Sequence, residues 1–238
     1  MATPLDDAVG YYSQAAQEFH ASYEHDPNRI ERMRVWTGFL DRYAAGVTFA
    51  YDIGCGSGIL ACELARRGIE TRGIDGAAGM LAIAQRSARA AALDNVSFER
   101  HLLPVRDTSA WRRAGLVVSS SAIEYLDSMA DALVFLRNLL QDGGVTIFSV
   151  SNRDSLSRRM VRTVHALTGR PRYLRFLRHF MTAEELKAAV RTAGFTFLEH
   201  AYFGQADRIN RVLSRVVAPR FASNMIIVAA RRAPDQSR

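Results

Sequence analysis

A short turn rich in glycine carries the residue types whose spacing best suits ligand binding. The segment Asp52-Ile53-Gly54-Cys55-Gly56-Ser57-Gly58 follows an apolar run and precedes an apolar pattern of helical period. Glycine adopts backbone conformations closed to other residues and lets a ligand approach the main chain closely. The helix after the turn offers N–H groups that have no partner within the helix. The turn is therefore the main candidate for a binding site.

A second acid and the spacing of the glycines indicate which ligand the turn binds. Asp75 ends the next β-rich run, where a carboxylate can accept the ribose hydroxyls of a nucleoside. A dinucleotide fingerprint would read G-x-G-x-x-G, whereas these glycines stand at 54, 56 and 58, and Asp52 precedes them. The charge of Asp52 would repel a pyrophosphate and attract a cation. We therefore favour S-adenosylmethionine, which has a sulfonium and an α-amino group, over NAD.

Five stretches of the chain resemble, in order, the motifs of one enzyme superfamily. Tyr51–Gly58 is similar to the first motif of the class I S-adenosylmethionine-dependent methyltransferases, and Gly73–Ala84 is similar to their second. Further resemblance lies at Val117–Leu126, Leu139–Ser149 and Phe180–Leu186, the last being similar to small-molecule members. The resemblance implies S-adenosylmethionine as methyl donor and S-adenosylhomocysteine as product.

The same resemblance implies roles for single residues. The turn would hold the methionine part of the donor, Asp75 the ribose and Met80 the adenine, while Arg34 would pair with the methionine carboxylate. An acid that often follows the third strand in the family is missing here, so we expect backbone groups near Leu102 to contact the adenine. The expected donor site comprises Asp52, Gly54, Cys55, Gly56, Gly58, Asp75, Gly76, Met80, Leu102, Ser120, Tyr12 and Arg34.

The elements that must position these residues alternate between strands and helices. Strands are predicted at 47–53, 70–74, 96–100, 116–120, 145–150, 195–202 and 225–230, and helices at 59–67, 79–91, 129–140, 182–193 and 206–217. This alternation predicts an α/β fold, a Rossmann-like doubly wound sheet that is mostly parallel. The last connection permits a parallel or an antiparallel final strand, and we favour the antiparallel one.

Two regions stand outside the alternation. Residues 1–45 read as two helices broken at Asp26-Pro27-Asn28, and we expect them to form a lid whose tyrosines, Tyr12 among them, either line the site or form the core of a cap. Residues 153–180 form an insertion after the fifth strand. We treat residues 1–238 as a single domain that includes both regions.

Methyl transfer requires an aligned nucleophile, and an oxygen or nitrogen nucleophile can also require a base. His179, at the end of the insertion, is our candidate base, the alternative being a surface or packing histidine. Glu124 follows the fourth strand, where an acid is also favoured simply by a helix N-terminus. No grouping of His, Cys and acids has the spacing of metal ligands, so no metal is expected, and Cys55 and Cys62 are interpreted as packing residues.

The insertion is strongly basic and amphipathic. Between residues 153 and 178 there are eight arginines and one acid, and residues 156, 160, 164 and 167 are apolar at helical spacing. Residues 208–217 repeat the pattern. Three interpretations stay open: helices packed on the sheet with solvated arginines, a rim for an anionic or lipid-linked acceptor with transient contact to an acidic membrane surface, or nucleic-acid binding. We disfavour nucleic acid because no interleaved aromatic residues offer a platform for bases.

The composition is that of a globular protein, with 48% hydrophobic and 23% charged residues and a net charge of +7. No apolar run is long enough to span a membrane, and the N-terminus lacks the pattern of a secretory signal, so a cytoplasmic location is expected. We expect methyl transfer to an oxygen or nitrogen atom of a small metabolite, anionic or lipid-like. The alternatives are an RNA methyltransferase, a non-catalytic donor-binding scaffold and an NAD-linked oxidoreductase. The sequence specifies neither the acceptor nor the oligomeric state.

Overall fold

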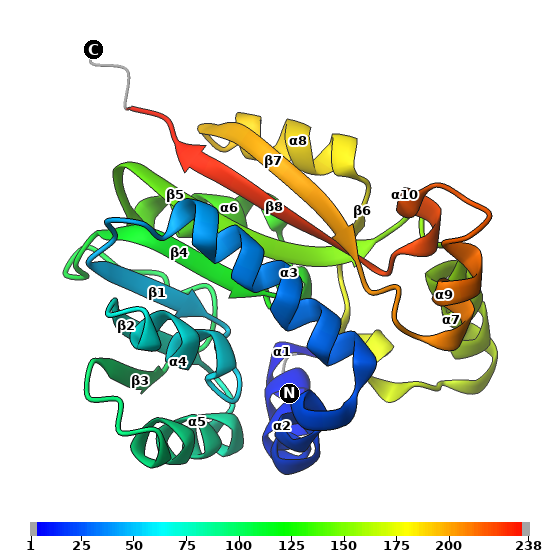
Figure 1. Ribbon diagram of the computed structural model, residues 1–238, viewed down its shortest axis with the longest axis horizontal. Helices are drawn as coiled ribbons and strands as arrows, with labels where there is room; N and C mark the ends of the chain where they lie inside the picture. The colour runs from blue at the N-terminus through cyan, green and yellow to red at the C-terminus, as the bar shows by residue number, and fades with distance from the viewer. Residues whose placement is uncertain (1–3, 235–238) are drawn as a thin grey trace.

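The computed structural model describes residues 4–234, which form a mixed sheet flanked by helices (Figure 1). The strand order is β3-β2-β1-β4-β5-β8-β7, with β6 paired to β5 outside this path. The strands are β1 (Phe49–Ile53), β2 (Glu70–Asp75), β3 (Val96–Arg100), β4 (Ala114–Ser120), β5 (Leu140–Asn152), β6 (Phe180–Met181), β7 (Phe195–Phe203) and β8 (Met225–Arg232).

Strands β1 to β6 pair in parallel, whereas β8 runs antiparallel to both β5 and β7. The predicted Rossmann-like sheet, mostly parallel with an antiparallel last strand, is confirmed. From β1 the chain first moves to β2 and β3 and then returns to β4 on the other side of β1. Such a reversal leaves a crevice at the carboxyl ends of the strands, where ligands bind in open α/β sheets.

The helices follow the predicted alternation, with one more break near the N-terminus. They are α1 (Pro4–Gln14), α2 (Ala16–His25), α3 (Pro27–Tyr43), α4 (Ile59–Arg66), α5 (Ala78–Ala90), the 3₁₀ turn η1 (Ile123–Tyr125), α6 (Met129–Leu139), α7 (Leu156–Thr168), the 3₁₀ turn η2 (Arg172–Phe176), α8 (Ala183–Thr192), α9 (Arg208–Leu213) and α10 (Pro219–Ala222). Ala15 separates α1 from α2, so three helices replace the two that we predicted. The predicted break at Asp26 is confirmed, because its side chain caps α3.

Two apolar layers hold the sheet between the helices. On one face, α3 and α4 pack against alternate residues of the central strands; the buried members include Trp36, Phe39, Leu40, Leu60, Leu64, Leu116, Val118 and Ile147. On the other face, α6 and α8 cover the intervening residues; the buried members include Tyr51, Ile53, Val117, Leu133, Leu136, Phe148, Leu186 and Val190. Strands that are buried on both faces read as continuous apolar runs, as β4 does.

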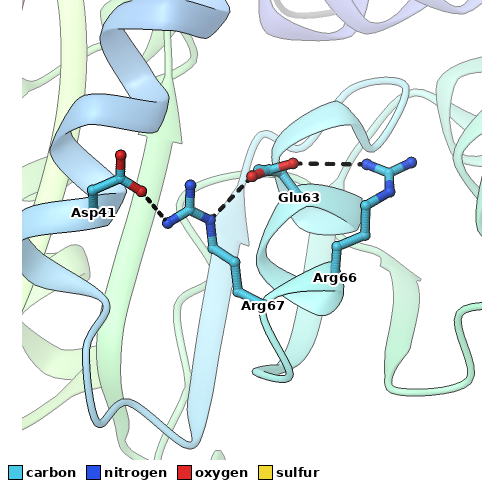
Figure 2. Close-up of polar contacts among 4 residues, drawn as sticks. All are labelled: Asp41, Glu63, Arg66 and Arg67. Atoms are coloured by element: carbon cyan, nitrogen blue, oxygen red, sulfur yellow. Dashed lines mark hydrogen bonds and ion pairs between the residues drawn. The ribbon is translucent and has the colours of Figure 1, made fainter.

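Helix α3 belongs to one of these layers, which corrects the prediction that all of residues 1–45 form a lid. Figure 1 shows α3 lying across the sheet, while α1 and α2 sit beyond the strand ends. Polar contacts also join α3 to α4: Arg67 Nη1 lies 2.7 Å from Asp41 Oδ1, and Arg67 Nε lies 3.0 Å from Glu63 Oε1 (Figure 2). Exposed ion pairs of this kind add little stability, so apolar burial is what holds α3 on the sheet.

Helices α1 and α2 dock instead on α5. Val9, Tyr12 and Phe19 pack on a small cluster that contains Met80 and Ile83. Helix α1 also packs closely against the first turn of α5, where the Gly79 N–H donates to Ser13 Oγ at 2.8 Å. This close packing requires glycine, because a Cβ at position 79 would lie 2.2 Å from the Ser13 carbonyl oxygen. Helices α1 and α2 therefore cover the strand ends, whereas the Trp36–Leu40 part of α3 packs on the sheet.

The start of α4 yields a stability prediction with a built-in control. Gly58 and Gly68 both have left-handed φ angles, +78° and +80°. A Cβ at Gly58 would lie 2.7 Å from Ala84 Cβ and 3.0 Å from the Phe98 ring, whereas a Cβ at Gly68 meets nothing within 4 Å. Gly68→Ala should cost about 1–2 kcal/mol of backbone strain, and Gly58→Ala should cost a further 1–3 kcal/mol, roughly, from overpacking. Urea unfolding curves of the two variants measure this difference, and equal midpoints would contradict the packing at Gly58.

Candidate functional site

A cavity of about 870 Å³ lies at the carboxyl ends of β1, β2 and β4, beneath the lid. One end is lined by the glycine turn and by residues 75–77, which follow β2. The middle is lined by residues 120–122 and 124–126, at and after the end of β4, and the far end by parts of α7, η2 and α9. The cavity thus occupies the crevice that the reversal of strand order creates.

The glycine turn crosses from β1 toward β2 and is held by backbone hydrogen bonds. The N–H groups of Gly54 and Cys55 both donate to the Ile74 carbonyl oxygen, at 2.8 and 3.1 Å. Gly54 and Gly56 have φ angles of +68° and +52°. A Cβ at Gly54 would lie 2.1 Å from the Ala122 Cβ, whereas a Cβ at Gly56 would have no neighbour nearer than 4.0 Å. Gly54 therefore permits close packing, and Gly56 leaves the main chain open to the cavity.

A buried carboxyl group, that of Asp52, and a partly buried one, that of Asp75, lie beside this turn. Asp75 accepts hydrogen bonds from the Gly56 N–H through Oδ2 and from the Ala77 N–H through Oδ1, both at 2.8 Å. Asp52 is 1% exposed, and its Oδ2 has no hydrogen-bond partner among residues 4–234. Burial raises the pKa of Asp52 to about 7, although a hydrogen bond from the Ala61 backbone lowers it, and the charge of Asp75 makes a smaller contribution in the raising direction. Because a buried carboxylate oxygen without a hydrogen-bond partner is costly, the site favours a ligand that brings a positive charge to Asp52 Oδ2.

A second set of charged groups lines the middle of the cavity. Arg32, from α3, donates through Nη1 to Ser120 Oγ at 3.2 Å. Glu124 lies in η1, and its Oε2 accepts the Ser151 N–H at 2.5 Å. Burial raises the pKa of Glu124, while the positive charges of Arg158 and Arg32 act in the opposite direction. This part of the cavity therefore combines one buried acid with two guanidinium groups.

The lid closes over the cavity through a pair of tyrosines. The hydroxyl oxygens of Tyr12 in α1 and Tyr125 in η1 lie 2.6 Å apart, and the two rings meet edge to face at 5.7 Å. Burial raises the pKa of Tyr12 to about 12, so its hydroxyl stays protonated. We expected the lid tyrosines either to line the site or to form the core of a cap. Tyr12 does both, because it lines the cavity and packs on α5.

Most residues expected to form the donor site meet in this cavity. Those that line it are Tyr12, Asp52, Gly54, Cys55, Gly56, Asp75, Gly76, Met80 and Ser120. Gly58 stands just behind the turn, where it precedes α4 and packs on α5. Leu102 is 52% exposed and lies outside the cavity lining, where its neighbour Leu103 is found instead. The expected contact between backbone groups near Leu102 and the adenine stays a prediction, and the Leu102 side chain packs near Gly76.

Arg34 and His179 do not reach the cavity. Arg34 is exposed, because the burial of Trp36 and Phe39 orients α3 so that Arg32 faces inward instead. The His179 ring is held outside, with Nε2 2.8 Å from the Leu126 carbonyl oxygen. Sequence reasoning missed Arg32, although its helical phase relative to the apolar residues of α3 would have indicated it. It also ranked Glu124 below His179, because local sequence does not show which group is buried at the site.

Neither a metal cluster nor a membrane-spanning helix is found in the part of the chain that the structure describes. No group of three or more His, Cys, Asp or Glu side chains among these residues could hold a metal ion. Within the same residues, no helix is both long enough and apolar enough to cross a bilayer.

Comparison with known proteins shows similarity to methyltransferases. A ubiquinone biosynthesis O-methyltransferase of Acinetobacter baumannii is 28% identical over 194 residues, which cover 76% of each chain. The crystal structure of magnesium protoporphyrin IX methyltransferase from Synechocystis PCC 6803 with bound S-adenosylhomocysteine superimposes with a TM-score of 0.74 at 14% identity, covering 97% of this chain and 100% of the other. A S-adenosylmethionine-dependent methyltransferase structure from Mesorhizobium loti gives a TM-score of 0.61 at 21% identity, covering 83% and 97% of the two chains.

The family model described as a methyltransferase domain matches residues 51–200, which run from within β1 into β7 and include Asp52, Asp75 and Glu124. This stretch is well over half of the chain. The protein therefore belongs to the methyltransferase-domain family.

Proposed function

We propose that this protein transfers a methyl group from S-adenosylmethionine to an oxygen or nitrogen atom of a small-molecule acceptor. The observation that carries the proposal is the buried, unpartnered oxygen of Asp52 beside a glycine turn that leaves its main chain open. A diphosphate would be repelled by this carboxylate, whereas a cationic donor would stabilise it. The relatives named as O-methyltransferases and the structural neighbour with bound S-adenosylhomocysteine support the same donor.

The residues at the turn end of the cavity suit the parts of this donor. Asp52 would face its positive charges. Asp75 would accept ribose hydroxyls, because a carboxylate offers about four lone-pair sites and its backbone donors do not fill them all. Arg32 would bind the methionine carboxylate in the role expected of Arg34. The donor supplies a methyl carbon that its sulfonium already makes electrophilic. The protein's contribution is therefore largely to align the acceptor and exclude water.

The acceptor would occupy the end of the cavity near α7, η2 and α9. The cavity volume of about 870 Å³ lies toward the upper end of the range of ligand pockets, about 300–1,000 Å³. Arg158, whose Nη1 donates to the Tyr173 hydroxyl at 2.7 Å, places a positive charge there. Leu177 and Ile209 add apolar surface. We infer an acceptor with both an anionic and an apolar part.

Glu124 replaces His179 as the proposed proton acceptor. It lines the cavity between the donor end and Arg158, whereas the His179 ring is bonded to a carbonyl oxygen outside. Burial raises the pKa of Glu124, which brings a carboxyl group nearer to the range useful to a general base.

The position of Arg32 can be tested against Arg34 on the same helix. Arg32→Ala should weaken S-adenosylmethionine binding about 10- to 100-fold, because a hydrogen bond to a charged group contributes about 1.5–3 kcal/mol. Arg34→Ala, which removes an exposed arginine, should leave binding within about twofold. Isothermal titration calorimetry measures both, and similar losses in the two variants would contradict the assignment.

Donor binding should depend on pH through Asp52. Because its pKa is raised to about 7, Asp52 is protonated below that pH and charged above it. The affinity for S-adenosylmethionine should therefore rise with pH from 6 to 8, with a slope below pH 7 that approaches about tenfold per unit. Asp52→Asn should bind more weakly at pH 8 and lose this dependence. A wild-type affinity that is unchanged across the range would argue against Asp52 as the cation partner.

Two variants test whether Glu124 acts as the base or has only a structural role. Glu124→Gln keeps an oxygen for the Ser151 N–H, so the fold and donor affinity should persist while kcat falls about 100-fold. His179→Gln should leave kcat within about twofold. Formation of S-adenosylhomocysteine with a phenolic carboxylate such as 3,4-dihydroxybenzoate measures both rates. Wild-type kcat should rise with pH as Glu124 ionises, and a profile that Glu124→Gln leaves unchanged would refute the role.

A further inference from the structure

Helices α7 and α9 have their polarity reversed relative to ordinary surface helices. A surface helix normally buries its apolar stripe and exposes polar residues. In α7 the residue that is buried is Ser157, and in α9 it is Asn210. Their large aliphatic residues face outward; the exposed ones are Leu156, Met160, Val164, Leu167, Ile209 and Val212, together with Val216 just after α9. Leu167 is 82% exposed and Val216 is 75% exposed.

The two helices lie next to each other at one end of the molecule, and hydrogen bonds connect their N-terminal ends (Figure 1). The Ser157 hydroxyl donates to Asn224 Oδ1 at 2.8 Å, and Asn224 Nδ2 lies 3.3 Å from Asp207 Oδ2, which belongs to the N-cap residue of α9. Partly buried hydrogen bonds therefore hold both helices from their polar sides. We call the outward residues Met160, Val164, Leu167, Ile209, Val212 and Val216 the α7–α9 face.

Positive charge surrounds this face. Eight arginines and one acid lie between residues 153 and 178, and residues 208–220 contain four arginines and no acid. Arg159, Arg170, Arg172, Arg208 and Arg215 are exposed. A two-fold interface between copies of this chain would bring these like charges together, and aliphatic side chains contribute nothing to binding nucleic-acid phosphates. Exposed aliphatic residues beside arginines are complementary to a lipid bilayer whose interior is apolar and whose surface is anionic.

We propose that the α7–α9 face docks on the surface of an anionic lipid bilayer. The aliphatic side chains enter the boundary between head groups and acyl chains, and the arginines contact lipid phosphates, as amphipathic helices do when they lie in a membrane interface. The contact is peripheral and reversible, and salt weakens it.

The same helices connect the face to the cavity. Arg158 and Val161 of α7 and Ile209 of α9 line its far end. An acceptor dissolved in the bilayer would therefore meet the cavity where the protein touches the membrane. This consequence rests on the proposed function, whereas the docking itself does not.

Vesicle co-sedimentation without any donor tests the docking. The wild type should bind vesicles of phosphatidylcholine with phosphatidylglycerol, and bind pure phosphatidylcholine much more weakly. Val164→Asp should reduce binding by at least about fivefold, while Val134→Asp on α6 should leave it unchanged. These two valines are equally exposed, at 46%, and both are changed to aspartate. A difference in vesicle binding between the two variants therefore reports where the valine lies and not the substitution itself.

A second pair of variants tests the charge. Arg159→Gln with Arg215→Gln should weaken binding to the anionic vesicles by at least about fivefold, whereas Arg86→Gln with Arg89→Gln on α5 should not. Thermal unfolding and S-adenosylmethionine affinity, measured on every variant, should match the wild type, which separates loss of docking from loss of the fold or of the proposed donor site. Absence of vesicle binding, or binding that Val164→Asp leaves intact, would overturn the proposal. So would a wild-type dimer that Val164→Asp dissociates, or arginine-dependent RNA binding without vesicle binding.

Discussion

The structure depends on two carboxyl groups near the ends of neighbouring parallel strands, Asp52, which is buried, and Asp75, which is partly buried. The register of β1 and β2 pairs Ile53 with Ile74, so the turn that follows reaches the Ile74 carbonyl and, through the Gly56 N–H, Asp75. This arrangement leaves one oxygen of Asp52 without a partner. Removing a carboxylate from water costs free energy that packing elsewhere must offset. Because the pKa of Asp52 is raised to about 7, a proton neutralises part of the Asp52 carboxyl groups near neutral pH in the free protein. A cationic ligand could take the place of that proton.

The cavity gains its shape from elements that are distant in the chain. The lid lies over the donor end because α1 and α2 dock on α5 and because the Tyr12 and Tyr125 hydroxyls meet. The segment after η2 closes the opposite side, since the backbone N–H groups of Arg178 and His179 both donate to the Glu124 carbonyl oxygen. Glu124 thus ties the middle of the cavity to the basic insertion through its main chain, while its side chain stays available to the site.

Polarity is distributed differently at the two ends of the molecule. Around the sheet, apolar residues are buried in two layers in the ordinary way. At α7 and α9 the buried contacts are hydrogen bonds among Ser155, Ser157, Asn210 and Asn224 with their neighbours, and the aliphatic residues point outward. Hydrogen bonds can hold a helix in place without using its apolar stripe, which leaves that stripe available to another apolar phase. The proposed membrane contact follows from this division.

The sequence by itself determined the alternation of strands and helices, the glycine turn and the two acids. Each of these depends on local properties: the period of apolar residues, the φ angles open to glycine, and the place of an acid at a strand end. Only the tertiary structure decided which charged groups meet in the cavity. Packing on the sheet set the rotation of α3 and selected Arg32 over Arg34, and a carbonyl far along the chain held His179 outside. Such choices depend on contacts between distant segments, whose geometry is not encoded in any one stretch of sequence.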